Sequence, residues 1–535
     1  MNFKDQENPD KLRGGYYTPP GVADFLARWG LAAGARRVLE PACGDGQLLA
    51  ALQRAARGRP LSITAVERDA EAAIRARADF PEVTLIEGDM LKLAQGPLRG
   101  ERFDLVIGNP PFIRYQYLDA DVAAAAERVL AEARVASTRH LNAWLPFLVD
   151  GLSRLNPGGR LAMVIPAELL QVRYATGLRA WLLELGIEVR VLAFQGRSFP
   201  GVQQEVVLVL AERRPGAVHL LEIEDLAALG GLDLDAQAGG ASAVPAGSKK
   251  WTRYFLDADQ LALLERLEAR PDLLRFEQIA SAVVGVVTGA NQHFAVDAET
   301  VARYALEPVA LPLLTRSQQL RGLAYTEADH RRNAAAGQRV FLLRFPEAPA
   351  ETLPEPWQRY IAEGEAQGLP GRFKCRIREP WFRVPDPWVP DLSLFKRGHD
   401  APRMVQNRAG VTSTDTAFRV SMTPAFAGRS ADFAFCFFNT LSFLCAEVVG
   451  RSYGGGVLEM VPSEVARVRV PLRAVPEAAF DRLDDMLRAG ASVDEALEFS
   501  DPIVLIDGLG LQEAEVEALR AMRRRLRGRR MARVK

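Results

Sequence analysis

Cysteine and histidine are scarce in this chain. The 535 residues include five histidines and four cysteines, which are Cys43, Cys375, Cys436 and Cys445. The cysteines form no CxxC pair and the histidines form no metal-spaced cluster, so neither a zinc site nor a disulfide framework is indicated. The sequence therefore predicts no metal and a reducing, cytoplasmic location.

The chain also lacks long apolar runs. No run reaches the roughly 18 residues that a membrane span needs. The N-terminal segment 1–8 is polar and has no signal-peptide core. We therefore expect no membrane contact.

An excess of charge of either sign is missing as well, because 67 basic and 67 acidic residues give a formal net charge of +0. This balance gives no global support for a polyanion partner and counts mildly against nucleic acid. The charge is uneven, since the tail from Arg520 to Lys535 is rich in arginine. Such an end either binds phosphate or forms a solvated helix, and local basic patches remain compatible with DNA binding.

A chain of 535 residues is too long for one ordinary core. Between about residues 14 and 215, short apolar runs alternate with segments of helical period. This alternation is typical of a mostly parallel, doubly wound α/β sheet. The predicted strands are 37–40, 62–66, 83–86, 103–107, 160–165, 189–193 and 206–210. The predicted helices are 21–31, 47–57, 70–78, 142–155 and 174–185.

Changes of composition indicate the domains. We expect residues 1–215 to form the first domain and residues 216–250, which become rich in Gly, Ala, Asp and Ser, to form a linker or long loop. From 251 to 475, aromatic residues, prolines and short irregular strands indicate an α+β domain. Residues 476–535 are expected to be a helical C-terminal tail with a basic end.

A glycine turn follows the first predicted strand. The run EPACGDG starts at Glu40 and contains Gly44 and Gly46, which let the backbone pass close to a ligand. The third glycine of the dinucleotide fingerprint is missing. Glu40 would repel a pyrophosphate and attract a cationic ligand. The turn therefore points away from NAD and towards S-adenosylmethionine, whose methionine end carries an ammonium group.

Acidic residues follow the next two strands. Glu67 can accept both hydroxyls of a ribose, and Asp89 can accept from an adenine amino group. Met90 or Arg68 would cover the adenine faces. Each acid taken alone can instead be a helix N-cap. Polar side chains at four successive strand ends favour a ligand site, because ligands of open α/β sheets bind at that edge.

The fourth of these strand ends carries the run Asn109-Pro110-Pro111-Phe112. The double proline cannot continue a strand ladder. The strand end therefore presents an amide, a rigid carbonyl-bearing turn and an aromatic ring. Those parts can hold a planar, amino-bearing group such as a nucleobase and polarise its NH2.

Taken in order, these motifs resemble those of the TaqI-like gamma-class DNA adenine-N6 methyltransferases of restriction-modification type. The resemblance rests on EPACGDG, AVERD, EGDML, IGNPPF, GGRLAMVIPAEL and SFPGVQQEVVLVL. It covers about residues 11 to 212. The segment 14–22, GGYYTPPGV, looks like the N-terminal cofactor motif of that group, and its place before the glycine turn is characteristic of the gamma order.

The resemblance implies a Rossmann-like catalytic domain that uses S-adenosylmethionine to methylate an adenine flipped out of double-stranded DNA. Glu67 would hold the ribose and Asp89 the adenine of the cofactor. Asn109 and the Pro110 carbonyl would accept from the target amino group, and the family more often has Tyr where Phe112 would stack on the base. The remaining implied residues are Tyr17, Thr18 and Pro19 against the methionine part, Glu40, Cys43, Gly44 and Gly46 in the cofactor cradle, and Phe199 at the target-base edge.

Two segments of the α+β region, 284–294 and 451–460, resemble the start and end of the target-recognition domain in related methylases. Between them, residues 372–378 alternate so that a strand would place four cations on one face, within reach of DNA phosphates. An exposed strand face with scattered charges is the other interpretation. The predicted DNA-binding residues are Arg372, Lys374, Arg376, Arg378 and Arg451.

Three functions remain open from the sequence. The first is site-specific DNA adenine-N6 methylation by an enzyme that is a monomer when free and works with or without a cognate restriction endonuclease. The second is methylation of an RNA base or a protein glutamine, which the NPPF turn would also suit. The third is a non-catalytic, methylase-like DNA-binding subunit. The large appended region favours DNA, and the intact series of acids favours an enzyme.

Overall fold

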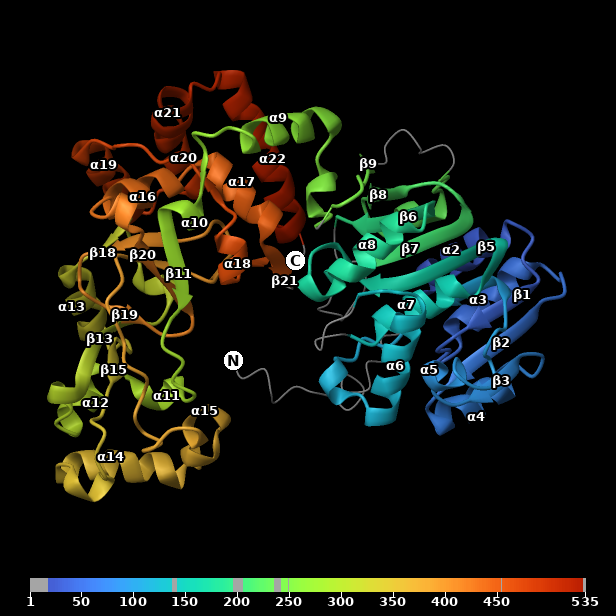
Figure 1. Cartoon of the computed structure of the whole chain (residues 1–535), viewed down its shortest axis with the longest axis horizontal. Coiled ribbons are helices and arrows are strands. Elements are labelled where there is room, and N and C mark those ends of the chain that lie inside the picture. Colours follow the sequence, from blue (N-terminus) through green and yellow to red (C-terminus); the bar gives the residue numbers. More distant parts are fainter. Residues whose placement is uncertain are drawn as a thin grey trace. The chain divides into compact units, whose positions relative to one another are not determined.

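The computed structural model describes residues 18–136, 142–195, 205–234, 242–248, 250–453 and 455–532. The chain divides into two compact units (Figure 1). Unit 1 contains Met1–Leu261 with Tyr453–Gly455 and Ala532–Lys535, and unit 2 contains Ala262–Ser452 and Gly456–Met531. Each unit has its own hydrophobic core.

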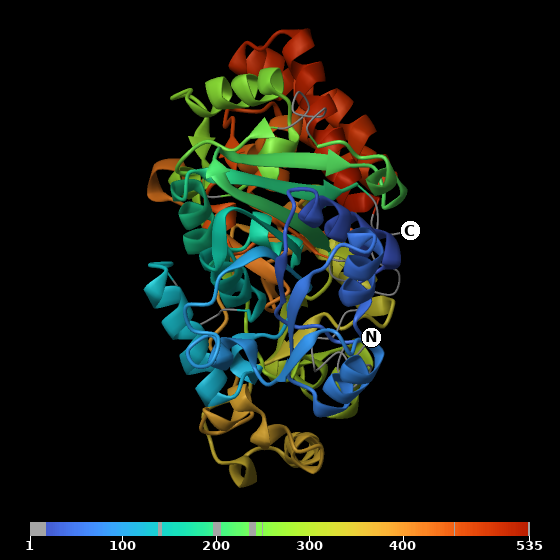
Figure 2. The same ribbon diagram turned by 90° about the vertical axis from the view of Figure 1, so that its right-hand side faces the viewer.

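The strands of unit 1 are β1 Arg37–Glu40, β2 Ser62–Glu67, β3 Thr84–Glu87, β4 Phe103–Gly108, β5 Leu155–Pro166, β6 Ile187–Phe194, β7 Val206–Pro215, β8 Val218–Ile223 and β9 Ser242–Ala243. In the described residues they form one nine-stranded sheet in the order β3-β2-β1-β4-β5-β7-β6-β8-β9. Figure 2 shows strands of this sheet side by side. β1 pairs in parallel with both β2 and β4. The strand order therefore reverses between β1 and β4, where open α/β sheets bind their ligands.

The helices of unit 1 are α2 Pro20–Leu31, α3 Gln47–Ala56, α4 Ala70–Asp79, α5 Met90–Leu93, α6 Ala120–Glu132, α7 Trp144–Ser153 and α8 Thr176–Glu184. They cover both faces of the sheet. Leu105 of β4 faces α2, where a Cβ on Gly30 would lie 2.7 Å from it, whereas Val106 faces Gly151 of α7. Successive strand residues point to opposite faces. The predicted doubly wound α/β fold is confirmed.

The local sequence explains where these helices begin. Pro20 occupies the first turn of α2, where a missing N–H is tolerated. Asp69 starts α4 by accepting a hydrogen bond from Ala72 N at 3.0 Å. Two further helices, α5 and α6, were not among those predicted.

The segment 216–250 differs in part from the predicted linker or long loop. Its residues 218–223 form β8, which pairs in parallel with β6, and Ser242–Ala243 form β9 at the sheet edge. Apolar residues of β8, such as Val218 and Leu220, are buried against the sheet. The Gly- and Ala-rich composition that indicated a loop belongs to the residues after β8.

Unit 2 has a mixed α+β structure, as the sequence predicted. Its described part includes a five-stranded sheet in the order β11-β20-β16-β18-β14 and a four-stranded sheet in the order β12-β15-β13-β19. The strands are β10 Leu274–Arg275, β11 Ala280–Val284, β12 Ala295–Val296, β13 Ala310–Leu314, β14 Ala324–Tyr325, β15 Phe341–Leu343, β16 Leu392–Phe395, β17 Arg397–Gly398, β18 Met404–Asn407, β19 Thr412–Ser413, β20 Ala417–Met422, β22 Val457–Glu459 and β23 Arg469–Val470, with β21 Arg451–Tyr453 at the division between the units.

Helices surround these sheets within unit 2. They are α10 Phe276–Ile279, α11 Asn291–Phe294, α12 Ala298–Arg303, α13 Glu327–Ala335, α14 Glu355–Ala366, α15 Phe373–Arg376, α16 Ser430–Phe437, α17 Thr440–Val449, α18 Pro462–Val465, α19 Glu477–Arg488, α20 Val493–Asp501, α21 Asp507–Leu509 and α22 Glu513–Met531, while α9 Ala258–Glu268 crosses the division between the units. Four of them, α19 to α22, lie in the predicted helical tail. Within the described residues, no single helix is long and apolar enough to cross a membrane, whereas the pair α16 and α17, bent by 75°, reaches that length and apolarity together.

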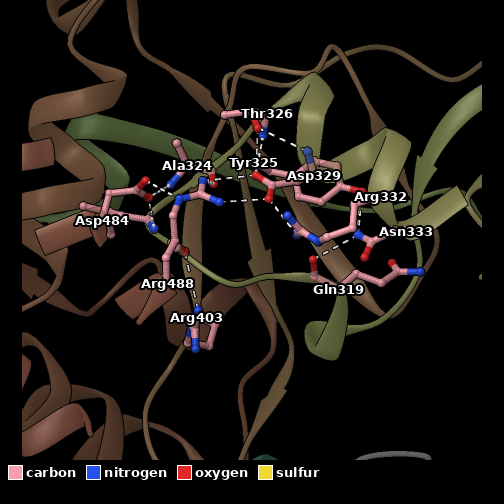
Figure 3. Close-up of polar contacts among 12 residues, drawn as sticks. Gln319, Ala324, Tyr325, Thr326, Asp329, Arg332, Asn333, Arg403, Asp484 and Arg488 are labelled. Carbon is pink, nitrogen blue, oxygen red and sulfur yellow. Dashed lines mark hydrogen bonds and ion pairs between the residues drawn. The ribbon is translucent and has the colours of Figure 1, made fainter. Parts of the chain in front are cut away.

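A partly buried ion-pair network joins α19 to α13 and β14 (Figure 3). Arg488 Nη1 and Nη2 donate to the two carboxylate oxygens of Asp329 at 2.8 and 3.0 Å, and its Nε donates to Asp484. Asp484 also accepts hydrogen bonds from the backbone N–H groups of Leu323 and Ala324. One arginine therefore fixes three elements of unit 2 that are distant in the chain.

Candidate active site

Four parallel strands of unit 1 end at one cavity. Its volume is about 600 Å³, and it lies at the carboxyl ends of β1, β2, β3 and β4. Nine of the residues that the sequence predicted for the site line it together: Thr18, Glu40, Cys43, Gly44, Glu67, Arg68, Asp89, Met90 and Asn109. The structure therefore brings these nine predicted residues together around one cavity.

The glycine turn forms one wall of this cavity. Gly44 and Gly46 have φ angles of +52° and +77°, which side-chain-bearing residues rarely adopt. A Cβ on Gly44 would meet nothing within 4 Å, whereas one on Gly46 would come within 2.3 Å of the Phe80 ring. Gly44 thus keeps the wall open to a ligand, and Gly46 lets α3 start close to Phe80.

Glu40 is a buried carboxylate at the end of β1, with only 1% of its surface exposed. Its Oε2 has no hydrogen-bond partner among the described residues. Burial, followed by the nearby charges of Asp45 and Glu67, raises the pKa of Glu40 well above its usual range. A cationic group beside Glu40 would satisfy this carboxylate and restore its charge.

Glu67 is held in a fixed orientation by the backbone. Its Oε2 accepts from Gly44 N at 2.8 Å and its Oε1 accepts from Asp69 N at 2.7 Å. The N-cap of the following helix α4 is Asp69, so the N-cap alternative is wrong for Glu67. The carboxylate keeps further lone pairs that hydroxyl groups of a ribose can use.

Asp89 fits both interpretations of the sequence, a helix N-cap and a residue of the ligand site. It caps α5 by accepting from Leu91 N at 3.0 Å, and it also lines the cavity. Its Oδ2 lies 3.8 Å from Arg68 Nη1, while Arg68 Nη2 donates to Asp119 just before α6. Arg68 therefore joins two acidic residues at the edge of the cavity.

The thiol of Cys43 is buried and neutral. Its environment in the glycine turn, first by burial and then by the charges of Glu40 and Glu67, raises its pKa well above its ordinary value. A thiolate is the reactive form of cysteine. Cys43 therefore has the surroundings of a packing residue rather than those of a covalent nucleophile.

The amide of Asn109 is oriented by Thr18. Asn109 Nδ2 donates a hydrogen bond to Thr18 Oγ1 at 3.1 Å. The two polar atoms of an amide point in different directions, so this bond turns Oδ1 away from Thr18. Thr18 itself is 6% exposed and lies just before α2.

The structure does not bring every predicted residue into the cavity. Pro19 precedes α2 and Pro110 follows β4, but neither lines the cavity. Phe112 packs against the hydrophobic core of unit 1, half-buried. Tyr17 and Phe199 lie outside the described residues. The roles proposed for these residues stay predictions.

Several lining residues were not among those predicted, notably Ile113, Tyr117 and Phe147. Tyr117 is 65% exposed and lies in a turn of 3-10 helix at Tyr115–Tyr117. The signal for Tyr117 in the sequence was the pair of tyrosines, Tyr115 and Tyr117, that follows the strand-end motif by a few residues. Phe147 lies on the apolar helix α7 and carries no signal of its own in the sequence.

In unit 2 the predicted strand over residues 372–378 is wrong. Residues 373–376 form the helical turn α15, in which Arg376 N donates to Arg372 O at 2.8 Å. Arg372, Lys374 and Arg376 are exposed, whereas Arg378 donates to the carbonyl of Thr288 at 2.7 Å. The four cations therefore do not share one face. Side chains alternate between two faces only in an extended strand, which needs hydrogen bonds to a neighbouring strand. Here the backbone hydrogen bonds close within the turn itself.

Arg451, the last predicted DNA-binding residue, lies on β21. Its Nε donates to Glu464 at 2.9 Å, and the side chain is one-fifth exposed. The ion pair gives Arg451 a structural role in unit 2. Its contact with DNA stays a prediction.

Comparison with known proteins relates two parts of this chain to family models. Residues 52–195 match the family described as Eco57I restriction-modification methylase, and residues 248–505 match the C-terminal domain of Type II methyltransferase M.Eco57I. The chain carries the domains of an Eco57I-type restriction-modification methylase. The methyltransferase expected from the sequence motifs is thereby confirmed at the level of the family.

Two relatives of the methylase align with most of its length. Type II methyltransferase M.AccI of Acinetobacter calcoaceticus is 21% identical over 84% of this chain and 84% of its own. Type II methyltransferase M.XamI of Xanthomonas campestris pv. amaranthicola is 23% identical over 86% of this chain and 85% of its own. Among solved structures, a DrdV–DNA complex has a TM-score of 0.50 at 12% identity and covers 90% of this chain and 57% of that one. This last likeness concerns the fold alone.

The cofactor of such a methylase is S-adenosylmethionine, and the residues of the cavity fit it. The buried, unpartnered Oε2 of Glu40 matches the ammonium group at the methionine end of the cofactor. The fixed carboxylate of Glu67 can accept from ribose hydroxyls, and Asp89 can accept from the adenine amino group. Met90 is 2% exposed and adds an apolar surface to the cavity.

Proposed function

We propose that this methylase transfers a methyl group to N6 of an adenine flipped out of duplex DNA. The observation that supports the proposal is the orientation of Asn109 at the end of β4. Its Nδ2 donates to Thr18, which turns its Oδ1 away from Thr18, and this Oδ1 would accept from a target amino group. Asn109 lines the same cavity as Glu40, Glu67 and Asp89.

N6 of adenine is a weak nucleophile because its lone pair is delocalised into the ring, so the enzyme must localise that lone pair. Asn109 Oδ1 and the Pro110 carbonyl would accept hydrogen bonds from the two N–H groups and draw them out of the ring plane, which localises the lone pair on N6. The bound cofactor supplies an electrophilic methyl group on a sulfonium sulfur. Positioning and dipolar stabilisation then account for most of the rate.

The target base must leave the duplex to reach such a cavity, and extrusion costs a few kcal/mol. Phe112 would offset this cost by stacking on the base, which contributes roughly 1–3 kcal/mol, and Phe199 would contact the base edge. Phe112 packs against the core of unit 1, and stacking would require one face of its ring to meet the base.

The two units would have different functions. We assign methyl transfer to unit 1 and recognition of the DNA sequence to unit 2, which contains most of the predicted target-recognition residues 251–475. Residues 476–535, the predicted tail, would support unit 2 through α19 and α22.

An enzyme acting on chromosomal DNA would work in the cytoplasm as a monomer, with or without a cognate endonuclease.

The test is to incubate the protein with labelled S-adenosylmethionine and duplex DNA, RNA or a protein extract. Label is expected in the DNA, and digestion to nucleosides should give N6-methyladenine. Asn109→Ala should abolish transfer and retain cofactor binding, because the cradle is formed by other residues. Label in RNA or protein alone, N4-methylcytosine in the digest, or turnover by Asn109→Ala would overturn the proposal.

A further inference from the structure

A short element of unit 2 exposes apolar side chains to solvent. Phe373 and Ile377 are 63% and 62% exposed, and they belong to α15 and the residue that follows it. A spacing of four places them on one face of a helical turn. We name residues 372–378 the α15 tip. Figure 1 shows α15 at the same end of unit 2 as α11 and α14.

The tip is held firmly from its other side. Cys375 is fully buried, with its Sγ 3.9 Å from Thr288 O, and Arg378 donates to the same carbonyl at 2.7 Å. Gly289 has a φ of +79°, and a Cβ there would lie 2.7 Å from Lys374 Cβ. The apolar face of the tip therefore stays outward because its inner face is anchored to residues 287–289.

Three cations flank the exposed apolar face. Arg372, Lys374 and Arg376 are exposed, and none of them has an ion-pair partner among the residues that the structure describes. Lys374 Nζ lies 5.4 Å from the centre of the Phe373 ring. Some exposed cations of unit 2 are instead paired, for example Arg344 with Asp386.

We propose that the α15 tip binds duplex DNA, with Phe373 and Ile377 contacting bases and the three flanking cations contacting phosphates. This inference rests on the proposed function and names the element that unit 2 would use. Duplex DNA carries one negative charge per roughly 1.7 Å of axis, which matches closely spaced, unpaired cations. Proteins that bend DNA insert apolar side chains of this kind between bases.

The charge argues against a protein partner for the tip. Charged residues are depleted at the centres of protein–protein interfaces and lysine over their whole area, whereas arginine is enriched there. Here three uncompensated cations surround two apolar side chains. Phosphates beside bases present the complementary arrangement of negative charge next to an apolar face.

The test separates the two kinds of contact. Phe373→Ala and Ile377→Ser remove the apolar face, while Lys374→Gln and Arg376→Gln remove charge. Val389→Ser is a matched control because Val389 is 60% exposed elsewhere in unit 2, and Arg303→Gln is a second one because Arg303 is exposed and paired with Glu299. Thermal unfolding of each variant confirms that the surface changes leave the fold intact.

Binding to plasmid-derived duplex DNA is measured between 50 and 200 mM salt, about the range over which phosphate contacts are resolved. Each charge variant is expected to reduce the slope of log affinity against log salt by about 0.9. Phe373→Ala should leave the slope unchanged, weaken binding about tenfold, as loss of one stacking contact does, and raise KM for DNA with kcat retained. The control variants should behave like the wild type.

The outcomes distinguish this inference from the proposed function. If the wild type methylates DNA and the tip variants match the controls, the tip does not bind DNA and a protein partner becomes the explanation for its apolar face. If the tip variants lose DNA binding but the wild type transfers no methyl group to DNA, the tip stands and the proposed function fails. A wild type that neither binds nor methylates duplex DNA overturns both.

Discussion

Thr18 and Asn109 lie 91 residues apart in the chain, and Asn109 Nδ2 meets Thr18 Oγ1 at 3.1 Å. Thr18→Val keeps the shape of the side chain but removes the hydroxyl that orients the Asn109 amide. We expect the kcat of methyl transfer to fall about tenfold, which corresponds to a barrier raised by roughly 1.4 kcal/mol. Cofactor affinity should hardly change, because the valine still packs in the same place. Single-turnover transfer and calorimetric titration measure these two quantities.

Thr18→Ser is the matched control for this position. Serine keeps the hydroxyl and loses only a methyl group, so kcat should stay close to that of the wild type. If serine and valine reduce kcat equally, packing rather than the hydrogen bond accounts for the role of Thr18.

Glu40 makes cofactor binding depend on pH. Its pKa in the folded protein is raised by burial, then by Asp45 and Glu67, so the free protein holds a proton on Glu40 above the ordinary glutamate pKa of about 4.3. A cationic ligand requires the charged carboxylate, and binding should release that proton. We expect affinity for S-adenosylmethionine to rise with pH until Glu40 is ionised in the free protein. Titration calorimetry in two buffers of different ionisation enthalpy detects the proton.

The stability of the cofactor-free protein gives an independent check on Glu40. A group whose pKa is raised by folding stabilises the fold at low pH, and this contribution is lost as pH rises through the folded-state pKa. Glu40→Gln removes the titration, so its melting temperature should exceed that of the wild type by more at pH 8 than at pH 5. A difference independent of pH would show that Glu40 does not carry a shifted proton.

At this scale the sequence predicted the acidic residues and Asn109 of the cavity, because the carboxyl ends of parallel strands meet at one edge. It did not reveal that Thr18 orients Asn109, since contacts between distant residues depend on the packing of α2 against the sheet. Nor did it separate Gly44 from Gly46. Both have positive φ, but only the fold shows that Gly46 makes room for Phe80.

At the scale of elements, sequence patterns succeeded where a strand or helix is long and buried. β4 and β5 were predictable because their apolar runs are buried between two layers of helices. α15 was not, since alternation of cations with Phe373, Cys375 and Ile377 suits a strand, while anchoring to residues 287–289 selects a helical turn. β8 was missed because the composition of the residues after it is that of a loop.

The Arg488 network predicts how unit 2 responds to acid (Figure 3). Burial alone would raise the pKa of Asp329, but hydrogen bonds from Arg488, the Thr326 backbone and Arg332 outweigh it and hold the pKa well below its usual range. The charged carboxylate therefore stabilises unit 2 above about pH 3.9, the ordinary aspartate pKa, and this contribution is lost as pH falls further. Asp329→Asn should destabilise unit 2 by about 3 kcal/mol at pH 7, since Arg488 loses its buried partner.

Urea unfolding at pH 7, 5 and 3 measures this effect, and the difference between wild type and Asp329→Asn should shrink at the lowest pH. Glu327→Gln is the matched control on the same helix, because Glu327 pairs with Arg331 at an exposed position. It should change stability by less than about 1 kcal/mol. Equal effects of the two substitutions would contradict the role assigned to the network.

At the scale of the whole molecule, a net charge of +0 does not show which arginines form ion pairs and which do not. The basic C-terminal end was expected either to bind phosphate or to form a solvated helix. In α22, Arg523 and Arg530 are buried and donate to Asp494 and Glu447, so both act inside unit 2. Unpaired cations instead flank Phe373 on α15. Total charge and charge runs therefore say little about where a polyanion would bind.

The two units also predict how the whole protein unfolds. Each has its own hydrophobic core, and the cofactor cavity is lined by residues of unit 1 alone. We expect two transitions in calorimetry. Cofactor at 100 times its Kd should stabilise unit 1 by about 2.7 kcal/mol and leave the other transition unmoved, because a ligand stabilises only the unit that binds it. Asp329→Asn should lower the second transition alone, which assigns it to unit 2. A single transition that shifts as a whole with cofactor would contradict independent unfolding of the units.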